Sequence, residues 1–340
     1  MVRLFEQREW SNAKDPMNIH IPSPVLAVKG EADPQWFKDL QRDGFAVIKG
    51  VVDPERAANY AERAEEWLEG FNLGYKRDDP VSWDVKHLPR HKKGGLYTQY
   101  SFAHSQFVWD AKSEPGIVGL YETIWGTDRL TVSFDGGSLN VPLPCDQVED
   151  NKAPWPHSDQ SAYRPWMHCI QGLLNLLPNG PNDGGLMVMR GSASLFPQYI
   201  AEHKHLEPPQ GWLKWDNFEW TEENLRWFQA KGCEWVKPEM GPGDFVLWDS
   251  RTVHYGAAPT EQKKRFAISV DVCYKPDALL SSEQREVKVE AFKRGYNTTH
   301  DPTDFIIHDG QEEPFNINLP YGPPVLSERA RKAVGLLPYD

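Results

Sequence analysis

Apolar positions recur at helical spacing in several stretches of this chain. The best example is a stripe of Ala57, Tyr60, Ala61, Ala64, Trp67 and Leu68. Asp53 and Pro54 precede this stripe and Gly70 follows it, which predicts a helix with Asp53 as its N-cap and Pro54 in its first turn. Similar signals predict helices at Pro34–Arg42, at Gly116–Trp125, from Ser282 onward, and from Ser327 to Val334 before Gly335.

Other apolar stretches are shorter and predict buried strands. Phe245 to Trp248 form such a run after the turn signal Gly241 to Asp244, and β-forming residues alternate from Arg265 to Tyr274. Further strands are expected at Cys169–Asn175, in the stretch after Gly184, and upstream at Val132–Val141. The pattern therefore predicts a strand-rich core that starts near Leu130, with helices flanking it.

His157, Ser158 and Asp159 are the first candidate site. A histidine two residues before an aspartate should occur roughly 0.8 times by chance in a chain of this composition, so the pair alone means little. The prolines around it disfavour a helix, and in an extended segment His157 and Asp159 point to the same side. A surface pair of histidine and aspartate is the simpler interpretation of these two residues alone.

His254 and Arg265 complete the candidate set. His254 follows the strand Phe245–Trp248, and Arg265 begins the next strand after a polar hairpin tip at Pro259–Lys264, so we expect them on neighbouring antiparallel strands. Two imidazoles and one carboxylate leave three adjacent positions open on Fe(II), enough for a chelating co-substrate and O2. An arginine nearby can bind a carboxylate bidentately. Taken singly, His254 is more typical of the core and Arg265 of the surface.

Several ordered motifs resemble the phytanoyl-CoA dioxygenase-like family of Fe(II)- and 2-oxoglutarate-dependent oxygenases. Asp43, Gly44 and Phe45, with the strand that follows, resemble its N-terminal signature. His157, Asp159 and His254 match the three iron ligands of the family, and Arg265 matches its 2-oxoglutarate arginine. Gly184 to Ser192 resembles a family stretch that ends in histidine, although this chain has Ala193 there. The resemblance covers roughly residues 35–275.

The resemblance implies a fold, cofactors and further site residues. The fold is a double-stranded β-helix, a jelly-roll barrel of the cupin type, mostly β with flanking helices. The cofactors are Fe(II), 2-oxoglutarate and O2, and ascorbate is expected to help in vitro. Many relatives place a serine two residues after the arginine, where this chain has Ala267. Ser269 is therefore expected to assist Arg265, and Asn140 to contact the co-substrate; a polar residue at a strand end explains Asn140 as well.

The resemblance also implies the chemistry. O2 oxidises 2-oxoglutarate to succinate and CO2, and the oxidant formed at the iron removes hydrogen from an unactivated C–H bond. Halogenases of this kind replace the carboxylate ligand with a small residue, so Asp159 favours hydroxylation, desaturation, epoxidation or cyclisation. The substrate is expected to be a small organic molecule, such as a secondary metabolite or an acyl derivative.

A function of another class is also open. A cupin-like metal-binding barrel could act as a redox-neutral isomerase or hydrolase, or bind a small molecule without turnover. Such a protein would need the metal ligands but not Arg265, so consumption of 2-oxoglutarate separates the two hypotheses.

Charge and cysteine content exclude some partners and locations. The net charge of −12 over 340 residues disfavours binding to nucleic acid or to an anionic membrane surface. The sequence contains no apolar run long enough for a membrane span and no secretory signal. The four cysteines form no Cys-x-x-Cys pair, which is typical of reduced thiols, so we expect a cytoplasmic protein. The oligomeric state is left open.

We expect one oxygenase domain over residues 1–340. Its family core spans 35–275, a Trp-rich insert spans 196–240, and a C-terminal extension spans 279–340. The tryptophans of the insert are expected to pack a flap on the barrel rather than to line a substrate pocket. The polar groups of Gln171 and Asn175 lie in an apolar run and need partners, which an active site or a neighbouring strand would provide equally well. His203 and His205 are expected at a solvated surface, and so is the basic cluster that includes Lys92 and Lys93. The family resemblance leaves a second interpretation open for these two lysines, as contacts of the co-substrate or of an anionic substrate.

Overall fold

The computed structural model describes residues 24–143, 154–213, 217–259, 266–308 and 321–339. Arg265 therefore lies outside the described residues, as does most of the expected hairpin tip. The helices within the described part of the chain are α1 (Gln35–Asp43), α2 (Pro54–Glu69), α3 (Gln106–Lys112), α4 (Pro115–Trp125), α5 (Ser192–Glu202), α6 (Glu222–Ala230), α7 (Ser282–Arg294) and α8 (Glu328–Val334).

The helix ends follow the capping signals in the sequence. The Asp53 side chain accepts hydrogen bonds from the backbone N–H groups of Glu55 and Arg56 at the start of α2. Ser281 begins α7 with a capping box, and Gly335 ends α8 in the left-handed conformation. The expected helices are confirmed within one or two residues at each end. None of the described helices has the length and apolar composition needed to cross a membrane.

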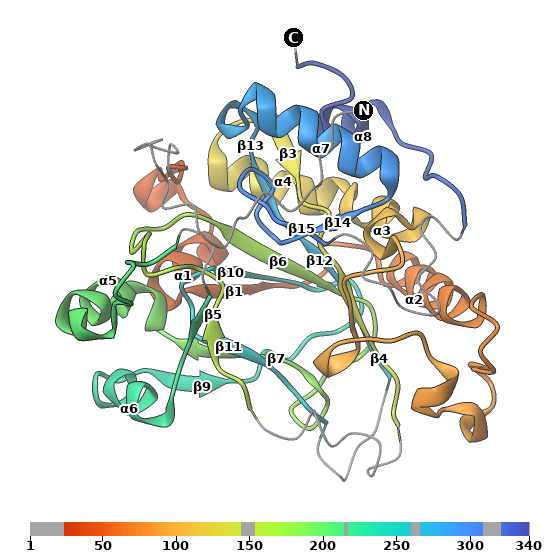
Figure 1. Cartoon of the computed structure of the whole chain (residues 1–340), viewed down its shortest axis with the longest axis horizontal. Coiled ribbons are helices and arrows are strands. Elements are labelled where there is room, and N and C mark those ends of the chain that lie inside the picture. The colour runs from red at the N-terminus through yellow and green to blue at the C-terminus, as the bar shows by residue number, and fades with distance from the viewer. Residues whose placement is uncertain (1–23, 144–153, 214–216, 260–265, 309–320, 340) are drawn as a thin grey trace.

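Two antiparallel sheets form the centre of the molecule (Figure 1). The larger has the order β1-β10-β6-β12-β4-β2 and the smaller the order β8-β5-β11-β7-β9. The strands of the larger sheet are β1 (Phe45–Ile48), β2 (Leu96–Tyr97), β4 (Gly137–Asn140), β6 (Ile170–Asn175), β10 (Phe245–Asp249) and β12 (Ala267–Val272). Those of the smaller are β5 (His157–Ser158), β7 (Gly185–Arg190), β8 (Phe218–Glu219), β9 (Glu234–Val236) and β11 (His254–Ala257). Two further pairs join β3 (Leu130–Val132) to β13 (Tyr274–Pro276), and β14 (Asn297–Thr298) to β15 (Ile307–His308).

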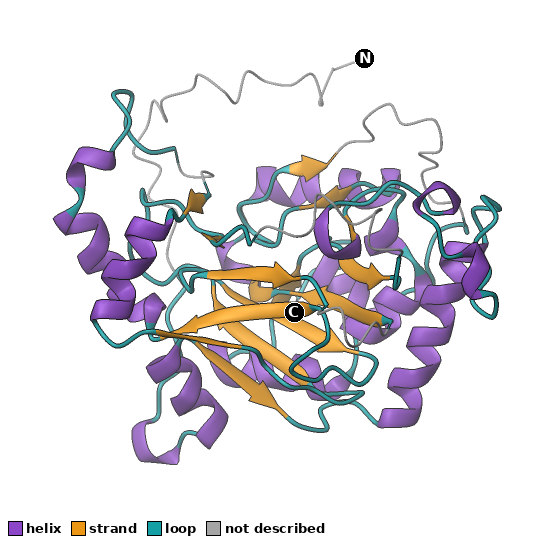
Figure 2. Cartoon of the chain, turned by 90° about the horizontal axis from the view of Figure 1, so that it is seen from below, coloured by secondary structure: helices purple, strands orange, loops and turns teal. Residues whose placement is uncertain are grey.

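Apolar side chains from both sheets meet between them. Phe45, Val246 and Trp248 from the larger sheet pack with Leu186 and Val188 from the smaller. A second, larger core fills the other face of the large sheet, where α2, α3 and α4 cover it. Figure 2 shows helices on several sides of the strands. This layering leaves the space between the sheets for side chains that face inward from both.

The structure corrects the expected relation between the strands that carry His254 and follow Arg265. β11 pairs with β5 and β7 in the small sheet, whereas β12 pairs with β6 and β4 in the large sheet. They are not hydrogen-bonded neighbours. The chain crosses from one sheet to the other after β11, as in a jelly roll, whereas a sequence pattern favours the shorter hairpin.

The expected strand Val132–Val141 is also divided. Its first part, β3, pairs with β13, and its second part, β4, joins the large sheet beside β12. Between them, the carbonyls of Ser133 and Asp135 accept hydrogen bonds from the buried Lys112 ammonium group. The connection between the two strands therefore solvates a buried cation with its carbonyl groups.

The insert and the C-terminal extension both pack on this framework. In the insert, Trp220 and Phe228 are buried with Tyr199 and Phe196, and Trp212, Trp227 and Trp235 pack against them, so the packing role is confirmed for these residues. Trp215 lies outside the described residues. The extension packs α8 against β3, and its β14–β15 hairpin reaches the space between the sheets.

Candidate metal centre and active site

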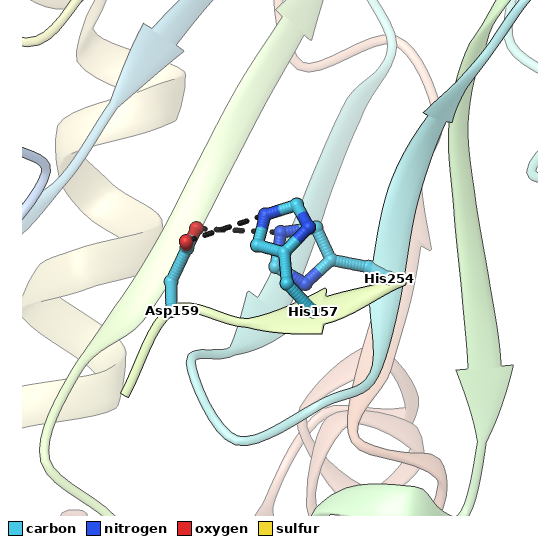
Figure 3. Close-up of side chains that lie close together, drawn as sticks. All are labelled: His157, Asp159 and His254. Atoms are coloured by element: carbon cyan, nitrogen blue, oxygen red, sulfur yellow. Dashed lines mark ion pairs between the residues drawn. The ribbon is translucent and has the colours of Figure 1, made fainter. Parts of the chain in front are cut away.

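Three side chains converge at one end of the small sheet (Figure 3). His157 on β5 and His254 on β11 are direct cross-strand partners, and Asp159 follows β5 by one residue. Asp159 Oδ1 lies 3.4 Å from His157 Nε2, and Asp159 Oδ2 lies 3.3 Å from His254 Nε2. One ligand atom from each residue lies within 4.8 Å of the other two. Among the described residues, this is the one group of three or more histidine, cysteine or carboxylate side chains that could hold a metal ion.

Backbone contacts fix the orientation of both imidazole rings. His157 Nδ1 donates to the carbonyl of Trp155 at 3.0 Å, and His254 Nδ1 donates to the carbonyl of Thr252 at 2.9 Å. Each ring therefore turns the lone pair of Nε2 toward the carboxylate, which can only accept when it is ionised. Three electron-pair donors facing one another need a cation between them. The donor set fits Fe(II) in the arrangement of two histidines and one carboxylate.

The short distances among the three side chains also change their pKa values. Burial alone would lower the pKa of His157, but the Asp159 charge outweighs burial and raises that pKa. Burial would raise the pKa of Asp159, yet the two histidines hold it well below its usual range. Burial and the proximity of His157 lower the pKa of His254. The shifts of His157 and Asp159 both show that the group favours a positive charge beside the Asp159 carboxylate, which is the charge that a bound cation would supply.

Neighbouring elements hold the three side chains in place. Gln171 on β6 donates through Nε2 to Asp159 Oδ2 at 3.1 Å, so its amide orients the carboxylate. Trp155 stacks on the His157 ring with a centroid distance of 4.2 Å. Ser158, which faces away from the centre, accepts from Trp220 Nε1 and donates to the carbonyl of Arg251. β8 of the insert also pairs with β5, so the insert positions His157.

The N-terminal Asp-Gly-Phe signature supports His254. The Gly44 carbonyl accepts hydrogen bonds from Thr252 Oγ1 at 2.8 Å and from the Asp249 backbone N–H at 2.9 Å. A side chain at Gly44 would lie 2.8 Å from Thr252 Oγ1, and its φ of 82° also favours glycine. Gly44 therefore lets the first strand approach the turn that leads into His254.

A cavity of about 430 Å³ opens over the three residues. We call one part of its wall the amide end, formed by Asn140, Asn175 and Ser269 on adjacent strands of the large sheet. The structure thus brings all three predicted residues into the same cavity as the metal-type ligands. Asn175 Nδ2 donates to the carbonyls of Leu177 and Gly241, so its amide group bonds mainly to backbone, as the structural alternative expects.

The remaining wall carries ionisable groups that the sequence analysis missed, and we call it the charged end. Its residues are Arg164, His168, Asp271, Asp301 and Asp304. Asp301 binds Lys275 at 3.0 Å and His168 at 2.8 Å, and Arg164 forms an ion pair with Asp304. Asp301 and Asp304 belong to the C-terminal extension, for which the sequence gives no signal. Asp271 had a signal, because it lies two residues after Ser269 on the same face of the strand.

The other residues considered from the sequence lie partly at this cavity and partly elsewhere. Lys92 and Lys93 line it, and burial lowers the pKa of Lys92. His203 bonds the carbonyl of Tyr199 and stacks on that ring, and His205 is exposed, so neither belongs to the metal-type group. Cys169 and Cys273 meet in the core as free thiols with their sulfur atoms 3.2 Å apart.

Known proteins resemble the chain in sequence and in fold. It is 37% identical over 283 residues to Ava biosynthesis cluster protein O of Aspergillus versicolor. This alignment covers 82% of this chain and 90% of that protein. EctD from S. alaskensis, crystallised with 2-oxoglutarate and 5-hydroxyectoine, has a TM-score of 0.50 at 16% identity, over 76% of this chain and 82% of that one. GIG2 from Candida albicans has a TM-score of 0.56 at 13% identity, over 90% and 77%.

These structural similarities confirm the expected double-stranded β-helix. The family assignment rests on sequence, because residues 40–267 match the phytanoyl-CoA dioxygenase (PhyH) family. That match covers both histidines, the aspartate and the Asp-Gly-Phe signature, and it extends over most of the chain. The chain therefore belongs to the phytanoyl-CoA dioxygenase family of non-haem oxygenases, and it is an oxidoreductase of the class that uses Fe(II), 2-oxoglutarate and O2.

Proposed function

We propose that His157, Asp159 and His254 bind Fe(II) and that the enzyme uses 2-oxoglutarate and O2 to oxidise a small organic substrate. The observation that carries this proposal is the shared direction of the two imidazole Nε2 atoms. Both face one carboxylate, and a backbone carbonyl fixes each ring from the opposite side. When bound, iron supplies the activation of O2 that protein side chains cannot.

The presence of Asp159 limits the outcome of the reaction. A carboxylate in this position occupies the place that a halide takes in halogenases of this kind. We therefore expect hydroxylation, desaturation, epoxidation or cyclisation of the substrate rather than halogenation. Gln171 contributes by holding the Asp159 carboxylate toward the two histidines.

We assign the 2-oxoglutarate position to the amide end of the cavity. Arg265 would bind the far carboxylate of the co-substrate, because it directly precedes β12, whose Ala267 and Ser269 line this end. Ser269 and Asn140 would supply further polar contacts there. Asn175 would support the wall, since its amide donors already bond to backbone carbonyls.

The relative in Aspergillus versicolor supports a class of substrate for this chain. That protein is named for a biosynthesis cluster, which supports a secondary metabolite as the substrate of this chain as well. The C-terminal extension lines the same cavity as the proposed iron ligands, which supports one oxygenase domain over the whole chain.

The proposal is tested by following 2-oxoglutarate. Purified protein with Fe(II), ascorbate and O2 should release succinate slowly without substrate and faster with the correct one. The anaerobic Fe(II) form should show a charge-transfer absorption band when 2-oxoglutarate is added. If neither succinate nor the band appears, the chain is not acting as a 2-oxoglutarate oxygenase, and a redox-neutral function becomes the better explanation.

A further inference from the structure

The charged end of the cavity pairs its carboxylates with cations, with one exception. Asp301 has Lys275, Asp304 has Arg164, and Asp135, which also lines the cavity, has Lys112 at 2.9 Å. Asp271 lines the same cavity, yet no hydrogen bond or ion pair reaches its carboxyl group from the described residues. One carboxyl group of this cavity is therefore left for a ligand to satisfy.

The strand register places Asp271 close to the metal centre. Asp271 lies opposite Leu173 on β6, and Gln171, which binds Asp159, is two residues from Leu173 on that strand. Diagonal neighbours of this kind in an antiparallel sheet are about 7 to 8 Å apart. A group bound at Asp271 would thus lie beside Gln171, which contacts the proposed iron ligand Asp159.

The position also follows from the direction of β12. Its cavity-facing residues run from Ala267 and Ser269, at the amide end, to Asp271, and the chain continues to Lys275, which binds Asp301. Asp271 therefore lies two residues farther along β12 from the proposed 2-oxoglutarate position than Ser269 does. That part of the cavity remains available to the substrate.

Electrostatics point to the charge of the missing partner. Burial and the nearby Asp135 charge raise the pKa of Asp271 to about 8, with Lys112 as a partial offset and Asp159 as a further negative group. In these surroundings the ionised form of the carboxyl group has a high free energy. A bound cation would remove that cost, whereas an anion would increase it.

We propose that Asp271 is a substrate-binding residue that selects molecules carrying a positively charged nitrogen, such as a protonated amine. The inference rests on the proposed function, because it places the amine beside the C–H bond that the enzyme oxidises. The substrate would be held by an ion pair between its ammonium group and the Asp271 carboxylate. The paired carboxylates Asp301 and Asp304 would form the surrounding wall.

The test uses three probes that share a phenyl ring and differ in charge: phenethylamine, 2-phenylethanol and phenylacetate. Binding to the full chain loaded with Ni(II) and 2-oxoglutarate, where no turnover occurs, is measured by isothermal titration calorimetry. A charge-assisted hydrogen bond corresponds to roughly 10- to 100-fold in affinity, so we expect phenethylamine to bind at least about tenfold more tightly than 2-phenylethanol. Phenylacetate should bind more weakly than either.

Two variants separate this role from a general effect of charge. Asp271→Asn keeps the shape of the side chain and should abolish the preference for the amine. Glu290→Gln removes the same charge from the surface of α7 and should leave that preference unchanged. The melting temperature of each variant reports whether it is folded.

Three results would overturn the proposal: no binding of the amine to the wild-type chain, equal binding of amine and alcohol, or an unchanged preference in Asp271→Asn. The last result would mean that Asp271 acts as a neutral acid or not at all. Repeating the titration without metal, and measuring succinate from the iron-loaded chain separately, shows whether a failure concerns Asp271 or the oxygenase function itself.

Discussion

The two ends of the cavity satisfy their polar groups in different ways. The amide end uses neutral side chains on adjacent strands, and Asn175 bonds mainly to backbone carbonyls. The charged end uses ions from distant parts of the chain, with Asp301 bound to Lys275 and His168. A neutral amide costs little when its bonds are shared with backbone, whereas a buried ion depends on its partner. We therefore expect the charged end to be the more fragile part of the fold, and the proposed metal centre to be the more fragile part of the activity.

The largest expected effect is a loss of activity without a loss of folding, caused by a substitution in the proposed metal centre. Asp159→Ala removes one of three proposed ligands, so we expect 2-oxoglutarate turnover to fall to background while the protein stays folded. Succinate release and the metal content of the purified protein measure this. His205→Ala, which removes an exposed histidine, should keep both. Activity in Asp159→Ala and its loss in His205→Ala would place the metal elsewhere.

The second prediction concerns the charged end. Asp301→Ala leaves the fully buried Lys275 without its counter-ion, so we expect a loss of about 3 to 5 kcal/mol in the free energy of unfolding. Urea denaturation measures it. Glu290→Ala breaks an exposed pair with Arg294 and should cost less than about 0.5 kcal/mol. A similar cost for the two variants would mean that the buried network does not stabilise the fold.

A third variant weakens the support of the metal centre without removing a ligand. Gln171→Leu deletes the amide that donates to Asp159 and should lower metal affinity by about 10- to 100-fold. Titration with Co(II), followed by absorbance, measures the affinity. Gln198→Leu, at an exposed position on α5 where the amide bonds Glu202, is the matched control. An unchanged affinity in Gln171→Leu would show that Asp159 needs no orienting group.

The smallest expected effect is a change in the pH dependence of stability. Burial and Asp135 raise the pKa of Asp271 from its usual 3.8 to about 8 in the folded protein. Between about pH 4 and 8 the unfolded chain releases this proton and the folded chain keeps it, so stability falls as the pH rises. Asp271→Asn should remove that slope and raise the metal-free unfolding free energy at pH 8. Parallel unfolding curves at pH 5 and pH 8 provide the test, and an unchanged difference between the two pH values would contradict it.

Sequence reasoning succeeded where the signal is local. The capping residues of α2 and α7, and the extended segment that carries His157 and Asp159, depend on neighbours within a few positions. It failed where the outcome depends on which strands pair: β11 and β12 belong to different sheets although they follow each other in the chain. Asp271 could have been predicted by the same alternation of side chains along the strand that indicates Ser269.

The C-terminal extension could not have been anticipated in the same way. Asp301 follows a helix and a short strand, and nothing in its surroundings indicates that Lys275 and His168 are its partners. Such partners are brought together only by packing, here by the β14–β15 hairpin and α8 against the core. The role of the Trp-rich insert has the same origin, since its contact with Ser158 joins positions about 60 residues apart.

The late position of Asp301 has a consequence for how the protein matures on the ribosome. His254 completes the metal-type ligands about 50 residues before Asp301 is synthesised. At about 5 to 20 residues per second, the nascent chain spends several seconds with all three ligands made and the charged end of the cavity still lacking its wall. During that interval the part of the wall that Asp301 and Asp304 form is still absent. We therefore expect that the proposed ligands can take up iron before the cavity closes around them.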